Sequence, residues 1–417
     1  MSSVTDTLAI DGGSRAVTTP RPPYRRFDAA EREALLQVLE SENLFRYLRE
    51  DESQVRVFEQ LFARKMGVPY ALAVSSGTTA LTCGLIGLGI GPGDEVIVPG
   101  YTYIASAAAI INARAVPVIA EVDDTLTLDP ADVQRKITPW TRAIMPVHMR
   151  GTPAQMEELL ALAEQHNLLV IEDTAQACGG SYRGRRLGTL GHVGCFSLQH
   201  FKIITTGEGG AVVTTNLQVF GRAVMYHDSG RPFWEGYEGE VIPGVGYRMS
   251  ELAGAMGRAQ IGKLDDILAR QRAAKARLVA QIRDVPGLQL QRIPDEAGDC
   301  GISLAIFLPD AATAHRFAAA LRAEGCGAGT MYDSEIPDRH IYYNWDHILA
   351  KKGYTPHGCP WTCEHYRGNV QYSKDMCPQT LGYLGRAVAI GLPDGLTEQE
   401  CDERALAIRK VAQAYLG

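Results

Sequence analysis

The sequence predicts an α/β fold, with a large domain whose mostly parallel sheet lies between helices and a smaller C-terminal α/β domain. Short apolar runs of strand type alternate with helical patterns from residue 70 onward, which is typical of a parallel sheet covered on both faces. The alternation starts again after a long helical pattern over residues 250–285. The chain has 417 residues, of which 46% are hydrophobic, and this length exceeds what one hydrophobic core usually serves.

We expect three regions along the chain. Residues 1–50 form an N-terminal arm with a short helix from Asp28 to Glu40, residues 51–285 form the large domain, and residues 286–417 form the small domain. The apolar runs that we predict as strands of the large domain cover residues 71–75, 95–99, 117–120, 143–148, 168–171 and 210–215.

The small domain carries two further strand-like runs, over residues 302–308 and 387–393, each followed by a helical pattern. The last helix begins with a capping box at Thr397 and Glu400. Between Tyr332 and Asp375 the periodicity is weak and aromatic residues are dense, so we expect a loop that covers a site.

Composition excludes two classes of partner. No apolar run approaches the roughly 20 residues that a transmembrane helix needs, so we expect no membrane contact. The net charge is -7, whereas nucleic-acid binding relies on clustered Lys and Arg, so we expect no nucleic-acid partner. The first residues lack the basic and apolar regions of a secretory signal, and we therefore expect a cytoplasmic protein.

The nine cysteines are scattered, which is typical of reduced thiols rather than of a disulfide framework. One group of thiols and imidazoles makes a zinc site an alternative, although it lacks a second, distant cysteine pair. We expect no metal and predict that these residues line or support a pocket. The group consists of His357, Cys359, Cys363, His365 and Cys377.

Lys202 stands between an apolar strand and a turn rich in Thr and Gly, about thirty residues after Asp173, which ends another apolar run. Burial among Phe196, Phe201 and Ile203 would lower the pKa of this lysine and make it nucleophilic near neutral pH. The pair predicts a lysine Schiff base with pyridoxal phosphate (PLP), whose ring nitrogen needs a carboxylate partner such as Asp173.

For each of these two residues alone the alternative is an ordinary structural role, a solvated loop lysine or a helix N-cap. Gln176 follows Asp173 by three residues, which would bring its amide within reach of the ring hydroxyl of the cofactor.

Two groups are candidates for holding the cofactor phosphate. Gly77 and Thr78 lie at a predicted helix N-terminus, and Ser197 offers a hydroxyl five residues before Lys202. Tyr103 follows a strand end and is either a ring-stacking residue or a core residue. Arg248 lies at a helix start, where a cation is unfavourable, so it is either held by an anion or a surface arginine.

Five motifs occur in an order that resembles the DegT/DnrJ/EryC1/StrS family of sugar aminotransferases, and the likeness covers almost the whole chain. The motifs begin with Ser-Ser-Gly-Thr-Thr-Ala-Leu at residues 75–81 and Pro-Gly-Tyr-Thr-Tyr at 99–103. They continue with Glu-Asp-Thr-Ala-Gln-Ala at 172–177, the stretch 191–210, and Tyr-Arg-Met-Ser-Glu at 247–251.

This resemblance implies PLP-dependent transferase fold type I, the aspartate aminotransferase fold, in a homodimer with active sites at the subunit interface. It implies transfer of an amino group from an amino acid, glutamate or glutamine, to a keto sugar or keto cyclitol. By similarity, Lys202 would bond to the cofactor and Asp173 would pair with its ring nitrogen. The other contacts implied are Gln176 with the ring hydroxyl, Tyr103 with the ring face, and Gly77, Thr78 and Ser197 with the phosphate; Arg248 is a further predicted cofactor contact.

The chain departs from the family pattern at two places. Many members have Asn where this chain has Gly246, so the contact to the neighbouring subunit's site is in doubt. Relatives often have His-Leu-Tyr-Gly where this chain has His148, Met149, Arg150 and Gly151, which predicts a cation near the substrate mouth. We predict substrate contacts at His148, Arg150 and Tyr342.

The function we predict is a PLP-dependent aminotransferase of amino sugar, aminocyclitol or antibiotic biosynthesis. The stretch Leu-Phe-Arg-Tyr at residues 44–47 and the aromatic loop resemble the aminocyclitol branch more than the nucleotide-sugar branch. Family relatives that dehydrate deoxysugars have histidine in place of the lysine. The presence of Lys202 therefore argues against dehydration here. Decarboxylation, elimination, oxidative deamination and a non-catalytic regulator on the same fold remain alternatives.

Overall fold

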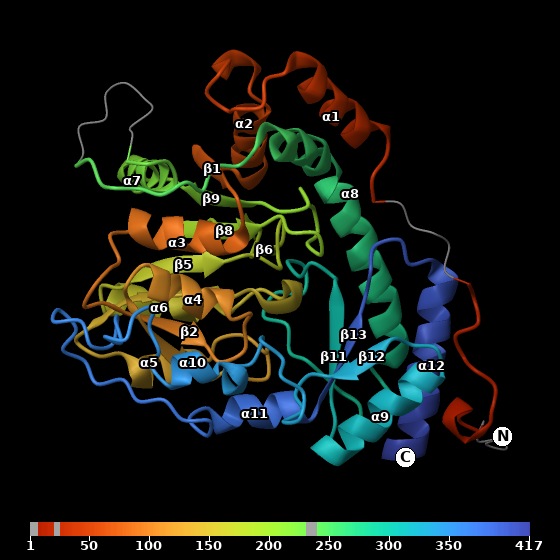
Figure 1. Cartoon of the computed structure of the whole chain (residues 1–417). Helices are drawn as coiled ribbons and strands as arrows, with labels where there is room; N and C mark the ends of the chain where they lie inside the picture. The colour runs from red at the N-terminus through yellow and green to blue at the C-terminus, as the bar shows by residue number, and fades with distance from the viewer. Residues whose placement is uncertain (1–6, 21–25, 231–239) are drawn as a thin grey trace.

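The computed structural model describes residues 7–20, 26–230 and 240–417. Its large sheet has seven strands in the order β1-β9-β8-β5-β4-β2-β3 (Figure 1). The five strands from β8 to β3 are parallel, whereas β9 runs antiparallel to both neighbours. This confirms the mostly parallel sheet. The strands are β1 Tyr70–Val74, β2 Glu95–Pro99, β3 Val116–Ala120, β4 Thr141–Ile144, β5 Leu169–Asp173, β8 Val193–Ser197 and β9 Gly210–Thr214.

Helices cover both faces of this sheet because alternate strand residues point to opposite sides. Along β1, Leu72 and Val74 belong to one core and Ala71 and Ala73 to the other. The first core is formed with α3 Gly77–Gly87, α4 Ala105–Asn112 and α7 Leu217–His227. The second is formed with α2 Gln54–Met66, α5 Pro130–Lys136, α6 Met156–Gln165 and α8 Glu251–Ile282.

A second sheet has four strands in the order β10-β11-β13-β12, all antiparallel. Its core is completed by helices and by the C-terminal part of α8, through Leu278 and Ile282. Because α8 contributes to both sheets, the predicted domain boundary at residue 285 stays a prediction. The elements are β10 Gln289–Leu290, β11 Ser303–Phe307, α9 Ala311–Ala323, β12 Ala328–Thr330, β13 Ala387–Gly391 and α12 Glu398–Leu416.

The N-terminal region contacts both parts of the molecule. Residues 7–20, with the 3-10 helix η1 Ala9–Asp11, lie on the small sheet's helices, where Glu324 accepts hydrogen bonds from the backbone N–H of Ala9 (2.8 Å) and Ala16 (2.9 Å). Helix α1 Ala29–Ser41 lies against α8 and begins with a capping box from Asp28, which confirms the predicted helix.

The aromatic segment between Tyr332 and Asp375 is where the prediction was wrong in part. Its tyrosines reach the far edge of the large sheet: Tyr366 Oη donates to Glu95 Oε1 (2.7 Å) and Tyr372 Oη to the Pro117 carbonyl (2.5 Å). The loop therefore covers the β2–β3 edge. The short elements of the chain are η2 Glu50–Glu52, η3 Met149–Gly151, β6 Ser181–Tyr182, β7 Arg185–Arg186, η4 Tyr342–Asn344, α10 Asp346–Leu349 and α11 Pro378–Gly385.

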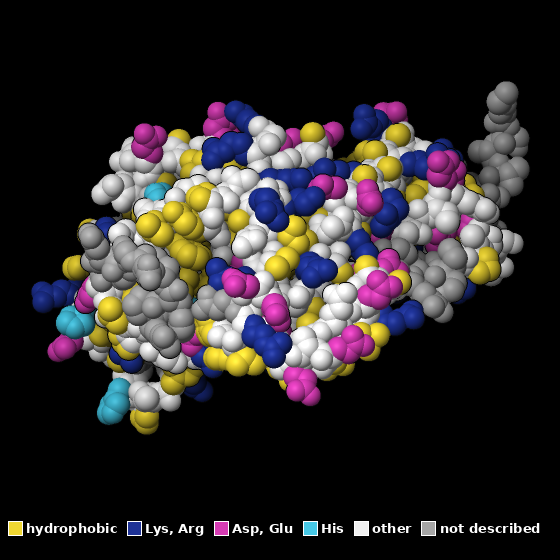
Figure 2. Space-filling model, turned by 90° about the horizontal axis from the view of Figure 1, so that it is seen from above, with side chains coloured by type: hydrophobic (Ala, Val, Ile, Leu, Met, Phe, Trp, Pro, Cys, Tyr) yellow, Lys and Arg dark blue, Asp and Glu magenta, His cyan; other side chains and the backbone are white. Residues whose placement is uncertain are grey.

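One face of the molecule carries exposed apolar side chains. Two of them lie beside the Asp228–Arg248 ion pair: the Arg248 guanidinium lies over the Phe45 ring at 5.8 Å, and Asp228 pairs through a β-bridge with Gly246, the neighbour of Val245. Figure 2 looks at the molecule from the α1 and α2 side and shows hydrophobic side chains gathered toward the α7 end. We call this group the apolar face; it comprises Leu44, Phe45, Leu48, Val241 and Val245.

In the part of the chain that the structure describes, no helix combines the length and the apolar character that crossing a bilayer requires.

Candidate active site

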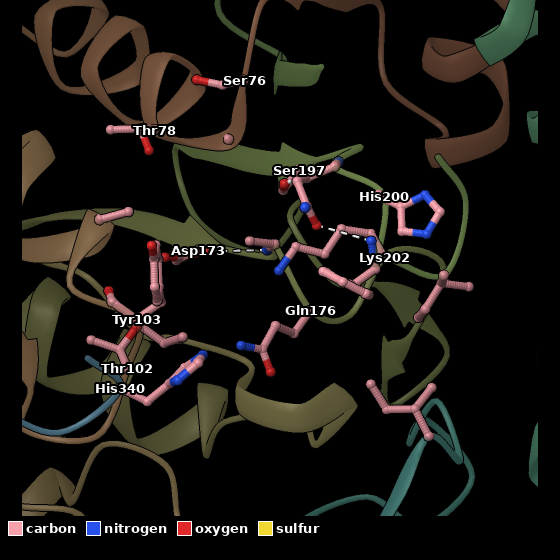
Figure 3. Close-up of a pocket in the computed structure, with 18 of the residues that line it drawn as sticks. Ser76, Thr78, Thr102, Tyr103, Asp173, Gln176, Ser197, His200, Lys202 and His340 are labelled. Carbon is pink, nitrogen blue, oxygen red and sulfur yellow. Dashed lines mark hydrogen bonds between the residues drawn. The ribbon is translucent and has the colours of Figure 1, made fainter. Parts of the chain in front are cut away.

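A cavity of about 1640 Å³ lies between the two sheets. It is bounded by the N-terminus of α3, the end of β5, the turn after β8, and residues that follow β13. Figure 3 shows the polar side chains that converge on it from the start of α3, the end of β5 and the turn after β8, together with Tyr103 and His340. Seven residues predicted from the sequence line this cavity: Gly77, Thr78, Tyr103, Asp173, Gln176, Ser197 and Lys202.

Lys202 lies in the turn that follows β8, and its backbone N–H donates to the Gln199 carbonyl at 2.9 Å. Burial lowers the pKa of its ammonium group, and the nearby charge of Asp173 acts in the opposite direction. Phe196 and Ile203 are buried as predicted, but Phe201 is 84% exposed. The prediction for Phe201 was wrong because the turn reverses direction there and directs the ring outward. The lysine is half-buried by the walls of the cavity instead.

Asp173 ends β5, and its carboxylate is buried at the floor of the cavity. Ser106 Oγ donates to Asp173 Oδ2 at 2.7 Å, and the Ala175 N–H donates to Oδ1 at 3.0 Å. Burial raises the pKa of this carboxyl, while the two donors and the charge of Lys202 act to lower it. Sequence reasoning missed Ser106, although its place four residues after Thr102 at a helix start was a signal; the two hydroxyls are 2.7 Å apart.

The first turn of α3 lines the cavity with Ser76, Gly77 and Thr78, an arrangement that favours anion binding. The first N–H groups of a helix have no partner inside the helix. Ser76 Oγ accepts from the Thr79 N–H and so satisfies one of them, and the N–H groups that precede Thr79 stay available. A Cβ added at Gly77 would lie 2.7 Å from the Cβ of Ser197, so only glycine lets the helix start approach the end of β8 this closely. The close approach places N–H groups and the Ser197 hydroxyl at the same wall of the cavity.

Gln176 and Tyr103 lie on the side of the cavity nearest η3 and α4. The Gln176 side-chain Oε1 accepts a hydrogen bond from the Arg150 backbone N–H at 3.0 Å, which fixes the amide in the cavity wall. The Tyr103 ring is 43% exposed, which favours the ring-stacking role over the core role, and its centroid is 5.2 Å from that of His340. His340 was missed from the sequence, because nothing singles it out within the aromatic segment.

Two predicted substrate residues belong to the core. His148 is fully buried, with Nε2 3.0 Å from Glu172 Oε2 and with Nδ1 accepting from the Ala154 N–H at 3.1 Å. Tyr342 is also buried, and its hydroxyl donates to the Lys374 carbonyl (2.5 Å) and accepts from the Cys377 N–H (3.1 Å). Packing and hydrogen bonds occupy both side chains and neither is among the described residues that line the cavity, so their roles as substrate contacts stay predictions that this arrangement does not favour.

Two predicted arginines lie outside the cavity in this chain. Arg150 has a left-handed backbone (φ 52°), which directs its guanidinium toward Tyr101, where Nε donates to the tyrosine hydroxyl at 2.7 Å. Arg248 is paired with Asp228 on the apolar face. Neither side chain is among the described residues that line the cavity, so their roles at the substrate mouth and at the cofactor stay predictions.

The residues of the zinc alternative do not converge. Within the described ranges, no three His, Cys, Asp or Glu side chains gather in an arrangement that would hold a metal ion. Cys359 is exposed and Cys377 is buried beside Tyr342. None of the five lines this cavity among the described residues, so the prediction that they line or support a pocket is not confirmed for this one.

The residues present fit PLP. The half-buried amine of Lys202, the buried carboxylate of Asp173 and the helix start at Gly77 lie on different walls of one cavity. Any side chain at Gly77 would fill the space between this helix start and Ser197. An aldehyde requires a nucleophilic amine, a protonated ring nitrogen requires an accepting carboxylate, and a phosphate requires N–H and O–H donors.

The model of the DegT/DnrJ/EryC1/StrS aminotransferase family matches residues 26–355. The chain belongs to this family. Its relatives include the L-glutamine:2-deoxy-scyllo-inosose aminotransferase of Streptomyces lividus, which is 36% identical over 342 residues, 78% of this chain and 81% of the relative. The GDP-perosamine synthase of Caulobacter vibrioides is 41% identical over 252 residues, 58% of this chain and 65% of the relative. The chain thus matches just under two thirds of that synthase.

Solved structures extend the family likeness over almost the whole chain. The structure of 3-amino-5-hydroxybenzoic acid synthase superposes with a TM-score of 0.79 at 29% identity, covering 95% of this chain and 99% of that one. Streptomyces venezuelae DesV superposes with a TM-score of 0.77 at 30% identity, with 95% and 99% covered. The fold type that the sequence resemblance implies is thereby confirmed.

Proposed function

We propose that this protein is a PLP-dependent aminotransferase that moves an amino group from glutamine or glutamate to a keto cyclitol or keto sugar. The observation that carries the proposal is the placement of Lys202 and Asp173 on one cavity together with the anion-binding start of α3. The names of the inosose aminotransferase and the perosamine synthase support the acceptor class, and the name of the former supports glutamine as the donor.

Each polar group of the site has a distinct task. When bound, PLP supplies an electron sink for the carbon that loses or gains a proton. Lys202 binds the cofactor and, as a free amine, takes the proton from the α-carbon of the donor; burial keeps more of this amine neutral by lowering its pKa. Asp173 holds the proton of the ring nitrogen, and Ser106 orients the carboxylate for this purpose.

The remaining residues orient the ligands. The first N–H groups of α3 and the Ser197 hydroxyl bind the phosphate, Gln176 contacts the ring hydroxyl, and Tyr103 covers a ring face. In the second half of the cycle, Lys202 returns a proton to the former carbonyl carbon of the acceptor, so one amine serves both substrates in turn.

We further propose that the protein acts as a homodimer through the apolar face. The five exposed apolar side chains of this face, of which Phe45 contacts the Arg248 guanidinium, are of the kind that partners cover. Gly246 lies on this face, and a Cβ added there would meet no atom within 4 Å, so the position is open toward a partner subunit. Arg248 would then serve the partner's site rather than its own.

The decisive experiment separates the two halves of the reaction. For the first half, purified protein is loaded with PLP, its absorbance is recorded before and after glutamine or glutamate is added, and the released keto acid is measured. For the second half, keto cyclitols and keto sugars are supplied to the aminated enzyme. We expect a donor-dependent spectral change in the wild type and none in Lys202→Ala. A spectrum that ignores every amino donor would indicate other PLP chemistry, and failure to bind PLP would refute the proposal.

A further inference from the structure

Arg26, in the N-terminal region, forms hydrogen bonds to the turn that carries Lys202. The guanidinium of Arg26 donates from Nη1 to the His200 carbonyl, and from Nη2 to the carbonyls of Lys202 and Ile203, the last at 3.3 Å. Arg26 also lines the cavity. One planar group therefore contacts three main-chain oxygens around the lysine, across more than 170 residues of sequence.

Three N–H groups of the turn are paired within the turn, whereas the carbonyls of His200, Lys202 and Ile203 accept from Arg26. The Lys202 N–H donates to the Gln199 carbonyl, the Phe201 N–H to the Gln199 side chain (2.9 Å), and the Thr206 N–H to the Leu198 carbonyl (2.9 Å). The contacts to the Lys202 and Ile203 carbonyls are part-buried and the contact to the His200 carbonyl is exposed, so the guanidinium bridges carbonyls from the surface of the turn to its partly buried side.

A buried glutamine holds the backbone of Arg26 against the same turn. Gln260 of α8 accepts from the Thr205 N–H at 3.2 Å, and its Nε2 donates to Glu31 Oε1 at 2.7 Å and to the Arg26 carbonyl at 3.5 Å. Lys263 adds an ion pair with Glu31 at 2.6 Å. The start of α1, the helix α8 and the lysine turn thus meet at one junction, which fixes where the Arg26 side chain begins.

We propose that Arg26 is a positioning residue for Lys202, and that residues 26–31 of the N-terminal region are part of the active-site framework. The expected effect on the reaction of Lys202 rests on the proposed function. The expected effect on the position of the turn does not. A planar guanidinium presents its donors in a fixed fork, so it sets the relative positions of three carbonyls in a way that a lysine ammonium does not. Reacting groups must be held closely, since a misplacement of about 1 Å costs on the order of 100-fold in rate.

The test compares three variants in the full-length protein. Arg26→Met removes the guanidinium, and Arg26→Lys keeps the positive charge without the planar group. Arg15→Met is the matched control, because Arg15 belongs to the same N-terminal region but donates from Nε to the Ala323 carbonyl of α9 (3.1 Å). The rate of covalent attachment of PLP to Lys202 is followed by absorbance, thermal unfolding monitors the fold, and free methylguanidinium is added to attempt rescue.

We expect Arg26→Met to attach PLP on the order of 10- to 100-fold more slowly, Arg26→Lys to recover little of this loss, and methylguanidinium to restore part of it. Arg15→Met should react like the wild type. A wild-type rate in Arg26→Met would overturn the proposal, as would an equal loss in Arg15→Met. Full recovery in Arg26→Lys would show that the charge acts and not the fork.

A second measurement is independent of the cofactor. Amide hydrogen exchange of residues 198–206 should be faster in Arg26→Met than in the wild type and unchanged in Arg15→Met. If the wild type never attaches PLP, the proposed function fails. The difference in amide exchange between Arg26→Met and the wild type still decides whether Arg26 holds the turn. Unchanged exchange in Arg26→Met would overturn the positioning role.

Discussion

The buried carboxylate of Asp173 shows how single residues set the chemistry of the site. Burial raises its pKa, whereas pairing with a ring nitrogen needs the charged form. The Ser106 hydroxyl and the Ala175 N–H offset the cost of burial through hydrogen bonds to the two carboxylate oxygens. In the proposed reaction, the balance between burial and these donors would set the lowest pH at which Asp173 stays charged.

Ser106→Ala tests this balance. Removing the donor raises the pKa of Asp173 further, and because the charged form is needed, the acid limb of kcat/KM against pH should move to higher pH. Ser106→Thr keeps the hydroxyl and serves as the control. An acid limb that stays in place in Ser106→Ala would show that Asp173 does not limit activity at low pH.

A second residue-scale prediction concerns stability. His227 is buried, with Nδ1 donating to the Val224 carbonyl and Nε2 3.3 Å from Arg46 Nη1. Burial, and then the charge of Arg46, lowers the pKa of His227 from 6.5 to about 4. The unfolded chain thus binds this proton more tightly, so the free energy of unfolding should fall as pH drops from 6.5 to 4, by about 3 kcal/mol from this group alone.

The measurement is denaturant unfolding at several pH values. His227→Gln should flatten the dependence between pH 4 and 6.5, whereas the exposed His166→Gln should leave it as in the wild type. Parallel curves for the wild type and His227→Gln would contradict the prediction.

At the scale of elements, the start of α3 depends on its contact with β8. Gly77→Ala would place a methyl group 2.7 Å from the Cβ of Ser197 and push the helix start away from the strand. We expect a loss of about 1–3 kcal/mol in stability from overpacking, together with weaker binding of PLP, because the phosphate site lies at this contact.

Gly262→Ala in the exposed interior of α8 is the matched control, since a Cβ there meets no atom within 4 Å. Alanine is the better helix former, so this variant should gain up to about 1 kcal/mol. Thermal unfolding and PLP titration of both variants make the comparison. Equal PLP affinity in Gly77→Ala and the wild type would place the phosphate elsewhere.

At the scale of the whole molecule, the apolar face predicts self-association. Leu48 is 62% exposed in the single chain, so Leu48→Glu should fold normally but introduce a charge into the proposed dimer interface. We expect sedimentation to show a dimer for the wild type and a shift toward monomer for Leu48→Glu, with loss of activity if Arg248 serves the partner's site.

Leu406→Glu on α12 is the control, because Leu406 is also exposed (45%) but belongs to the small domain's helices. It should remain dimeric. A monomeric wild type, or a Leu48→Glu variant that stays dimeric at every concentration, would contradict the interface.

The sequence predicted what depends on local pattern and on the order of motifs. The alternation of apolar runs gave the strands, since burial on both faces leaves continuous apolar segments such as residues 95–99. The spacing of Gly77, Asp173 and Lys202 predicted one site because parallel strands and the turns after them end at one sheet edge.

Only the tertiary structure decided which side chains reach the cavity. The side chain of Arg150 turns away because its backbone is left-handed, His148 is held by Glu172, and the loop that carries Tyr342 covers the β2–β3 edge. Arg26 and Ser106 reach the site from segments distant in sequence from the residues they contact. No local pattern encodes such contacts, because side-chain direction and long-range hydrogen bonds depend on how the elements pack.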